Sequence, residues 1–346
     1  MVPRPSLREQ AVESAVAKLT EYLSQDPDQN LDRMIAIARR LAIAPNHREI
    51  IDNFTGMLED HPSIREYMTR VLTETHPNCR QKFMMNLAVK SSLLGIPKHA
   101  QKKDELGVNV PYTILIDPTE ACNLRCTGCW AGKYKASTLP YEVLDRIIRE
   151  AKELGIHFFV LSGGEPFAYP HLMRLIADHQ DAAFMVYTNG TLITAEVADK
   201  LQEYGNLSPA ISLEGFREST DARRGEGTFD RVMQTMDLLK ERGIPFGYSV
   251  TVTKNNIDEV FGDAFIDAMI DKGALYGWSF HYVPVGRDPD LDLLISPEQR
   301  LWLAERVVEV RMNRPIVVMD FWNDGEQTLG CIAGGRRYFH ITADGY

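Results

Sequence analysis

The sequence predicts an α/β fold, a full or partial barrel of parallel (β/α) units preceded by a small all-α region. From about Pro111, short apolar runs rich in β-formers alternate with longer amphipathic stretches, which is typical of βαβ units and a parallel sheet. Residues 1–105 instead show the three- and four-residue spacing of helices and almost no strand pattern. We therefore expect a helical domain over 1–105, a barrel over 106–320 and a C-terminal extension over 321–346.

Each expected element follows from these patterns in order. Pro45, Pro62 and Pro77 divide the first region into four or five short helices. The expected strands are 112–116, 158–161, 183–187, 210–213, 246–252, 277–283 and 316–319. The expected helices between them are 141–154, 195–204, 229–242, 257–272 and 297–312. In such a sheet the reactive groups belong at the carboxyl ends of the strands.

The composition narrows the class of protein. The chain has 346 residues, 44% of them apolar and 25% charged, so it can bury a large core and is neither disordered nor a disulfide scaffold. Its net charge of −10 argues against nucleic-acid binding. The chain has no apolar run of the roughly 20 residues that span a bilayer and no signal-peptide h-region. We therefore expect a cytoplasmic protein.

Three of the five cysteines form a C-x3-C-x2-C loop directly after the first expected strand: Cys122, Cys126 and Cys129. Three thiolates can bind three irons of a [4Fe–4S] cube. The fourth iron is then open to a substrate or cofactor, as at a catalytic metal site. The alternative is a structural zinc site with His157 or His281 as fourth ligand. Zinc loops usually present two separated pairs of ligands, and no second C-x2-C occurs here.

Further motifs follow the next strands. Gly163-Gly164-Glu165-Pro166 comes after the second strand; its glycines allow close backbone approach, and Glu165 offers a carboxylate to an ammonium group. An ordinary turn is the alternative. The third strand ends in Tyr-Thr188-Asn189-Gly. The fourth ends in Ser212-Leu-Glu214-Gly, and Arg224 follows ten residues later.

This order of motifs resembles the radical S-adenosylmethionine (SAM) superfamily, in particular its subgroup with SPASM or Twitch extensions. The resemblance implies a (β/α)6-type barrel and a [4Fe–4S] cluster on the three cysteines, with SAM bound at the open iron. It also implies that Gly163, Gly164, Glu165 and Pro166 bind the amino group of SAM, that Thr188 and Asn189 lie near its ribose, and that Ser212 and Arg224 hold its carboxylate. The alternatives are that Asn189 caps a turn and that Arg224 pairs with Glu226.

Two positions depart from the family pattern. The residue before the third cysteine is often aromatic in the superfamily and is Gly128 here. Trp130 or Tyr134 is our candidate to replace that ring near the adenine. The acid of the fourth-strand motif is Glu214 rather than aspartate, and we assign it no role.

The C-terminal segment resembles the opening of a SPASM or Twitch module, in which a cysteine is followed by a hairpin. Cys331 is therefore a candidate ligand of an auxiliary iron–sulfur cluster, which we expect only in a longer chain. The alternative is a buried free cysteine.

Residues 80–103 carry six Lys and Arg and no acid. A helix over 82–96 would align Lys82, Asn86 and Lys90 on one stripe with apolar side chains around the rest. Such a helix is a candidate for peripheral membrane contact. The alternative, which base rates favour, is a core helix packed on the barrel.

By this resemblance the protein is an enzyme that reductively cleaves SAM to a 5′-deoxyadenosyl radical, which abstracts hydrogen from an unactivated C–H bond. A lipid chain is our substrate guess and a peptide or protein the alternative. A second alternative is a non-enzymatic iron–sulfur or zinc protein. We expect an electron donor such as flavodoxin or ferredoxin and no nucleic-acid partner. The candidates to line the substrate pocket are Tyr248, His281, Tyr282 and Arg287.

Overall fold

The computed structural model describes residues 7–41, 45–132 and 137–346. Within these residues, eight strands form one parallel sheet in the order β7-β6-β5-β4-β3-β2-β1-β8. The strands are β1 (Thr113–Ile116), β2 (Phe158–Leu161), β3 (Ala183–Thr188), β4 (Leu207–Leu213), β5 (Gly247–Val252), β6 (Tyr276–His281), β7 (Val317–Asp320) and β8 (Tyr338–Ile341). The predicted α/β class with a partial parallel barrel is confirmed.

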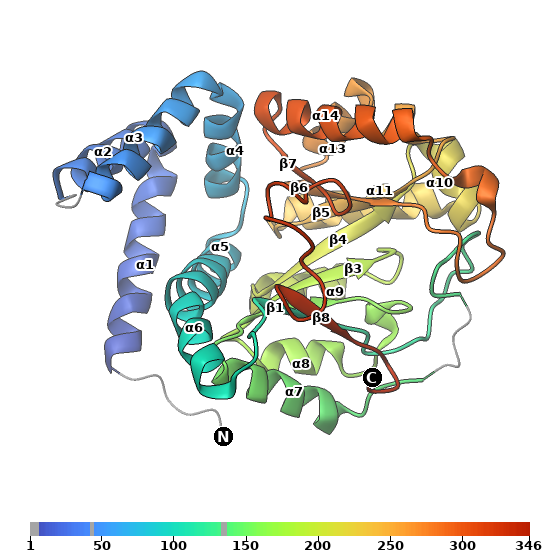
Figure 1. Cartoon of the computed structure of the whole chain (residues 1–346), viewed down its shortest axis with the longest axis horizontal. Helices are drawn as coiled ribbons and strands as arrows, with labels where there is room; N and C mark the ends of the chain where they lie inside the picture. The colour runs from blue at the N-terminus through green and yellow to red at the C-terminus, as the bar shows by residue number, and fades with distance from the viewer. Residues whose placement is uncertain (1–6, 42–44, 133–136) are drawn as a thin grey trace.

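Helices connect the strands and cover the outer face of the sheet (Figure 1). They are α7 (Tyr141–Glu153), η2 (Pro166–Ala168), α8 (Leu172–Asp178), α9 (Ala195–Tyr204), α10 (Arg217–Arg224), α11 (Thr228–Glu241), α12 (Ile257–Val260), α13 (Asp263–Asp271), η3 (Leu291–Leu293) and α14 (Pro297–Asn313). The helix predicted over 257–272 is divided into α12 and α13, because Gly262 adopts an extended conformation and caps α13.

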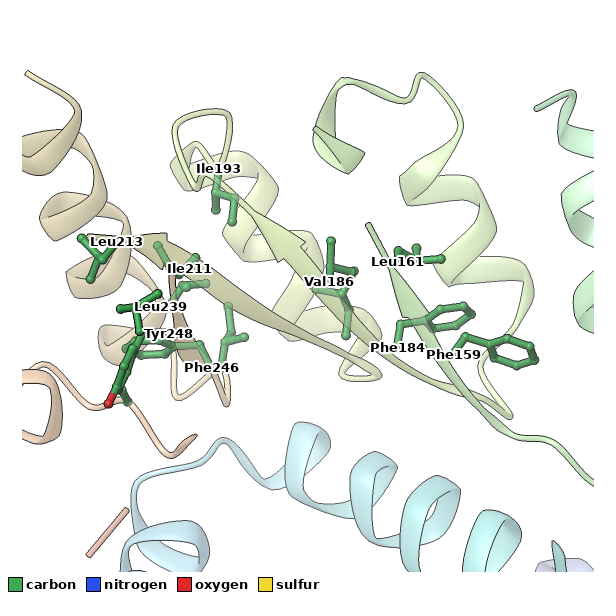
Figure 2. Close-up of a cluster of buried hydrophobic side chains, with 14 of the residues drawn as sticks. Phe159, Leu161, Phe184, Val186, Ile193, Ile211, Leu213, Leu239, Phe246 and Tyr248 are labelled. Carbon is green, nitrogen blue, oxygen red and sulfur yellow. The ribbon is translucent and has the colours of Figure 1, made fainter. Parts of the chain in front are cut away.

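The main core lies between the sheet and these helices (Figure 2). Alternate side chains of each strand point into it, as the two-residue period of a strand requires. Phe159 and Leu161 of β2 are fully buried there, beside Phe184 of β3. The residues between them face the inside of the curved sheet, where Val160, Met185 and Ala210 form a smaller cluster. This inner face also carries the aromatic rings of Tyr187 and Trp278.

The N-terminal helices lie on the side of the sheet opposite the loop that follows β1 (Figure 1). They are α1 (Leu7–Gln25), α2 (Pro27–Leu41), α3 (Pro45–Asp60), α4 (Pro62–Thr73), α5 (Pro77–Phe83), η1 (Met84–Leu94) and α6 (Gly95–Leu106). Their bonds to the barrel go to backbone just before its strands: Arg70 Nη1 donates to Pro315 O at 2.7 Å, ahead of β7. The helical region therefore covers the amino ends of the strands.

Asn86, at the middle of the stripe predicted for Lys82, Asn86 and Lys90, faces the barrel. The helix predicted there forms the π-helix η1, in which Asn86 is buried and donates from Nδ2 to Ala182 O at 2.9 Å. Leu93, Leu94 and Ile96 at its end are exposed. This is the packing of the core-helix alternative. No helix in the described ranges is both long and apolar enough to cross a bilayer.

The C-terminal segment differs from the expected hairpin. Residues Tyr338–Ile341 form β8, which pairs in parallel with β1 in the register Thr113↔Tyr338 to Ile116↔Ile341. This strand was not predicted, because its partner is the first strand of the sheet and not a neighbour in sequence. Parallel pairing needs such a long connection, whereas a hairpin is local.

Candidate functional site

The three-cysteine loop follows β1 at the carboxyl edge of the sheet, on the right of Figure 1. Cys122 is exposed, and Cys126 and Cys129 are half-buried. The groups around the Cys122 sulfur partly withdraw it from water, which raises its pKa, and the nearby charges of Glu165, Cys126 and Cys129 raise it further. Cys126 and Cys129 therefore lie near the Cys122 sulfur.

The Gly163-Gly164 loop packs directly on the cysteine loop. The N–H of Gly164 donates to Thr119 O at 2.9 Å, and the N–H of Glu165 donates to Ala121 O at 2.8 Å. A Cβ on Gly164 would lie 2.3 Å from that alanine oxygen. Gly163 has a φ of +105°, which side chains rarely adopt. The glycines thus allow close approach, and the backbone they approach is that of the cysteine loop.

Glu165 is fully buried and its carboxylate is bonded within the chain. Oε1 accepts from Thr188 Oγ1 at 2.7 Å and from the N–H of Phe167 at 3.0 Å, and Oε2 accepts from the N–H of Asn189 at 2.7 Å. Burial raises the pKa of Glu165, although these bonds oppose the rise. The carboxylate ties the end of β2 to the end of β3, and Pro166 starts the short helix η2 beneath it.

Asn189 binds the cysteine loop through a side-chain network. Its Nδ2 donates to Asn123 Oδ1 at 2.9 Å, and Asn123 Nδ2 donates to Thr191 Oγ1 at 2.8 Å. The Oδ1 of Asn189 also accepts from the N–H of Thr191 at 2.9 Å. The turn-capping alternative for Asn189 is therefore present, together with a contact to the residue after Cys122.

Glu214 is the centre of a buried charge cluster at the end of β4. Its Oε1 accepts from Nε and Nη2 of Arg224, at 2.9 and 2.5 Å, and from Nη1 of Arg223. Arg223 also donates from Nε to Thr127 O at 3.1 Å, within the cysteine loop. The substitution of glutamate for aspartate thus has a role, and the partner of Arg224 is Glu214 rather than Glu226.

The guanidinium of Arg224 faces the thiols. Burial alone would lower its pKa, but Glu214, Cys126 and Cys129 outweigh burial and raise it. Among the described residues Nη1 has no hydrogen-bond partner, so one edge of the fork is free for a carboxylate. Ser212 is half-buried on the inner face, with its Oγ 3.2 Å from Ser249 Oγ.

An aromatic ring, that of Tyr282, packs against Gly128. A Cβ on Gly128 would lie 2.9 Å from Cε2 of Tyr282, a buried side chain in the loop after β6. Trp130, our candidate for this role, is 56% exposed, with its ring 6.5 Å from that of His340. Tyr134 lies outside the described residues.

The other predicted pocket residues have different positions. Arg287 binds the cysteine loop: its N–H donates to Cys129 O at 2.9 Å, and its Nη2 donates to Gly132 O at 3.3 Å. Tyr248 was wrongly predicted to line the pocket. It belongs to the outer core (Figure 2), where its ring lies edge-on to that of Phe265 at 5.7 Å, because alternation along β5 points it toward the helices.

The histidines proposed for a zinc site are bonded elsewhere. His157 precedes β2, at the opposite end of that strand from the Gly163-Gly164 loop, and its Nδ1 lies 2.9 Å from Asp181 O. Nε2 of His281 lies 3.3 Å from Asp320. In the part of the chain that the structure describes, no three His, Cys, Asp or Glu side chains gather closely enough for one metal ion. Cysteines that bind different irons of a [4Fe–4S] cluster do not need to lie close enough to share one metal ion.

One pair at this edge was not found from the sequence. Asp117 begins the cysteine loop, and His340 of β8 lies beside it, with Nε2 and Oδ2 2.9 Å apart. No local pattern marks the two residues, because only the pairing of β8 with β1 brings them together. Cys331 is exposed, contrary to the buried alternative. A cavity of about 420 Å³ opens at the start of β1 and β8, at the opposite edge from the cysteine loop.

Comparisons with known proteins identify a family for part of this chain. Residues 116–264 match the Radical SAM superfamily. An AdoMet-dependent heme synthase of Methanosarcina barkeri is 31% identical over 53% of this chain and 54% of its own. The mycofactocin maturase MftC of Mycolicibacterium smegmatis is 31% identical over 59% of this chain and 53% of its own. The chain thus spans about half the length of these curated relatives.

A solved structure shares the fold. Streptococcus suis SuiB, bound to its precursor peptide SuiA, aligns with a TM-score of 0.58 at 16% identity, over 80% of this chain and 74% of its own. The superfamily uses a [4Fe–4S] cluster and SAM, and the relatives above are enzymes. Residues 116–264 of this chain thus contain a Radical SAM domain.

Proposed function

We propose that Cys122, Cys126 and Cys129 bind a [4Fe–4S] cluster beside SAM, and that the enzyme abstracts hydrogen from an unactivated C–H bond of a peptide. The observation that carries the proposal is the set of three thiols on one loop, with a guanidinium facing two of them. When bound, the cluster and SAM together supply a 5′-deoxyadenosyl radical. The protein contributes orientation and exclusion of water.

The chain offers a group for each charged end of SAM. The free Nη1 of Arg224 suits the carboxylate of SAM. Ser212, on the inner face of β4, is the second candidate for that carboxylate. Because the carboxylate of Glu165 is buried and bonded, we assign the ammonium to backbone oxygens of the loops at Gly163 and Gly164 rather than to that side chain. Tyr282 supplies the aromatic ring beside the third cysteine, and Thr188 and Asn189 fix the loop on the other side.

A peptide is the substrate class that the relatives favour. MftC is named a maturase, and the related fold of SuiB has been seen with a precursor peptide. No observation favours the lipid chain. A low-potential donor such as ferredoxin or flavodoxin is needed to reduce the cluster, and membrane contact through residues 80–103 has only the exposed Leu93, Leu94 and Ile96 in its favour.

Anaerobic reconstitution tests the proposal. With iron and sulfide we expect about four irons per chain, and with dithionite and SAM we expect 5′-deoxyadenosine. Cys126→Ala should lose the iron, whereas Cys331→Ala, which removes an exposed thiol outside the loop, should retain it. A loop saturated by zinc that yields no nucleoside would contradict the proposal.

The same assay separates the substrate classes. Peptides of varied sequence and extracted lipids are added to the loaded enzyme, and 5′-deoxyadenosine is measured over the background of uncoupled SAM cleavage. We expect acceleration by peptides. Acceleration by lipids alone would restore the lipid hypothesis.

A further inference from the structure

Two histidine–aspartate pairs lie at the carboxyl edge of the sheet, and among the described residues only one of them has all of its carboxylate oxygens hydrogen-bonded. In the first, Asp320 accepts from the N–H groups of Trp322 and Asn323 through Oδ1, at 3.1 and 3.2 Å. Its Oδ2 accepts from the side chain of Asn323 at 2.8 Å. Both oxygens have partners, so the pair with His281 holds a turn.

The second pair leaves an acceptor unmet. Asp117 is 5% exposed, and its Oδ1 is buried without a hydrogen-bond partner among the described residues. Nε2 of His340 lies 2.9 Å from Oδ2, but the ring N–H is not aligned with that oxygen, and this nitrogen also lacks a hydrogen bond. Buried polar groups in proteins almost always have partners, so a buried oxygen without one calls for a water, an ion or a ligand group.

Asp117, whose Oδ1 has no hydrogen-bond partner among the described residues, lies on the inner side of the barrel. Ile114 and Ile116 of β1 face the outer core, so strand alternation turns Leu115 and Asp117 inward. His340 is the register partner of Leu115, and therefore also faces inward.

The cysteine and glycine loops border this point. The exposed ring of Trp130, which follows Cys129, contacts the ring of His340. The position of a Cβ on Gly163 is 3.0 Å from Cβ of Asp117. The buried oxygen thus lies among the glycine loop, β8 and the residue that follows Cys129.

We propose that Asp117, His340 and Trp130 form a subsite for a protonated amine or guanidinium group of the substrate. The inference rests on the proposed function and names the chemistry that the site selects. An N–H donor on a cation satisfies Oδ1 with a charge-assisted bond, and the indole face attracts the same charge. His340 positions the carboxylate. The net charge of −10 favours approach of a cationic group.

The test compares two labelled peptides on the reconstituted enzyme with SAM present. The probes are fluorescein-labelled Gly-Ser-Lys-Ser-Gly and the same peptide with norleucine, which keeps the length of lysine and removes its charge. Fluorescence anisotropy should show the lysine peptide binding at least about tenfold more tightly, the size expected for a charge-assisted bond. Asp117→Asn should abolish this preference, and Trp130→Phe and His340→Gln should reduce it.

Matched measurements keep the result interpretable. Asp199→Asn removes the same charge from an exposed pair on α9 and should keep the preference. Thermal unfolding by circular dichroism establishes that each variant is folded. Equal binding of the two peptides, or none by either, overturns the subsite. So does an Asp117→Asn variant that weakens SAM binding as much as peptide binding, because the cation would then be that of SAM itself.

The subsite and the proposed function fail in different ways. Iron content and 5′-deoxyadenosine formed without peptide report on the proposed function. The ratio of the two peptide affinities reports on the subsite alone.

Discussion

The two sides of the site are built differently. On the motif side, the loops after β1–β4, the recognisable residues bind one another: Glu165 joins β2 to β3, and Glu214 holds two arginines. On the far side, the ends of β6–β8, isolated residues such as Tyr282 and His340 reach across to the cysteine loop. The motif residues therefore bind one another and the cysteine loop, whereas on the far side single residues pack against that loop.

The largest effect that would test this contrast is at Glu214. Glu214→Ala removes a buried carboxylate from two half-buried guanidinium groups, and breaking a buried ion pair costs about 3–5 kcal/mol. Urea denaturation should show that loss in the free energy of unfolding. Asp230→Ala, at the exposed pair with Arg217, is the control and should cost within about 1 kcal/mol. Equal losses for both would mean that the charge cluster is not a structural centre.

On the far side, Tyr282→Ala removes a buried ring from Gly128. Truncation of a buried aromatic residue costs about 3 kcal/mol or more, and the cysteine loop should bind less iron after reconstitution. Tyr282→Phe keeps the ring and loses only the bond that Tyr282 OH accepts from the N–H of Asp290 at 2.9 Å, worth about 1 kcal/mol. If the Ala variant bound iron as well as the wild type, packing from this side would not support the loop.

The positions of the residues on the motif side could be predicted from the sequence, because each motif lies next to its strand along the chain. Each strand runs directly into its motif, and Pro45, Pro62 and Pro77 each begin a helix. The predicted positions of the cysteine loop and of Gly163-Gly164 at neighbouring strand ends follow from parallel order alone.

The far side could not be read in this way. The partnership of Tyr282 with Gly128, or of His340 with Asp117, depends on which strands are neighbours in the sheet. The bonding of Glu165 within the chain could not be predicted either, because a carboxylate in a glycine motif looks the same in sequence whether it is buried or open.

A smaller effect is expected at Gly164. In Gly164→Ala the new Cβ would lie 2.3 Å from Ala121 O, so the glycine loop and the cysteine loop must separate. Overpacking of this kind costs about 1–3 kcal/mol, and iron binding should fall with it. Gly325→Ala, with no atom within 4 Å of the new Cβ, should change the free energy of unfolding by within about 0.5 kcal/mol. A neutral Gly164→Ala would show that the two loops are not packed as described.

The smallest effect concerns a thiol in the N-terminal helical region, which belongs to neither side of the site. Cys79 of α5 is fully buried, and burial raises its pKa to about 12, so at pH 8 only about one molecule in 10⁴ carries the reactive thiolate. Iodoacetamide labelling of the iron-free protein, followed by mass spectrometry, should modify the exposed Cys331 and leave Cys79 unmodified until urea unfolds the chain. The rate at which Cys79 reacts should rise as the pH approaches 12, because more of this thiol is then ionised. Rapid labelling of Cys79 in the folded protein would show that the helical region opens readily.

The pairing of β8 with β1 has a consequence for biosynthesis. β1 is among the first parts of the barrel to leave the ribosome, and β8 is the last strand of the described sheet to do so. Until then one edge of β1 has no partner, and the side of the iron-binding loop next to Trp130 is uncovered. Because the two strands are far apart in sequence, this edge of the sheet is completed by a long-range contact that forms slowly.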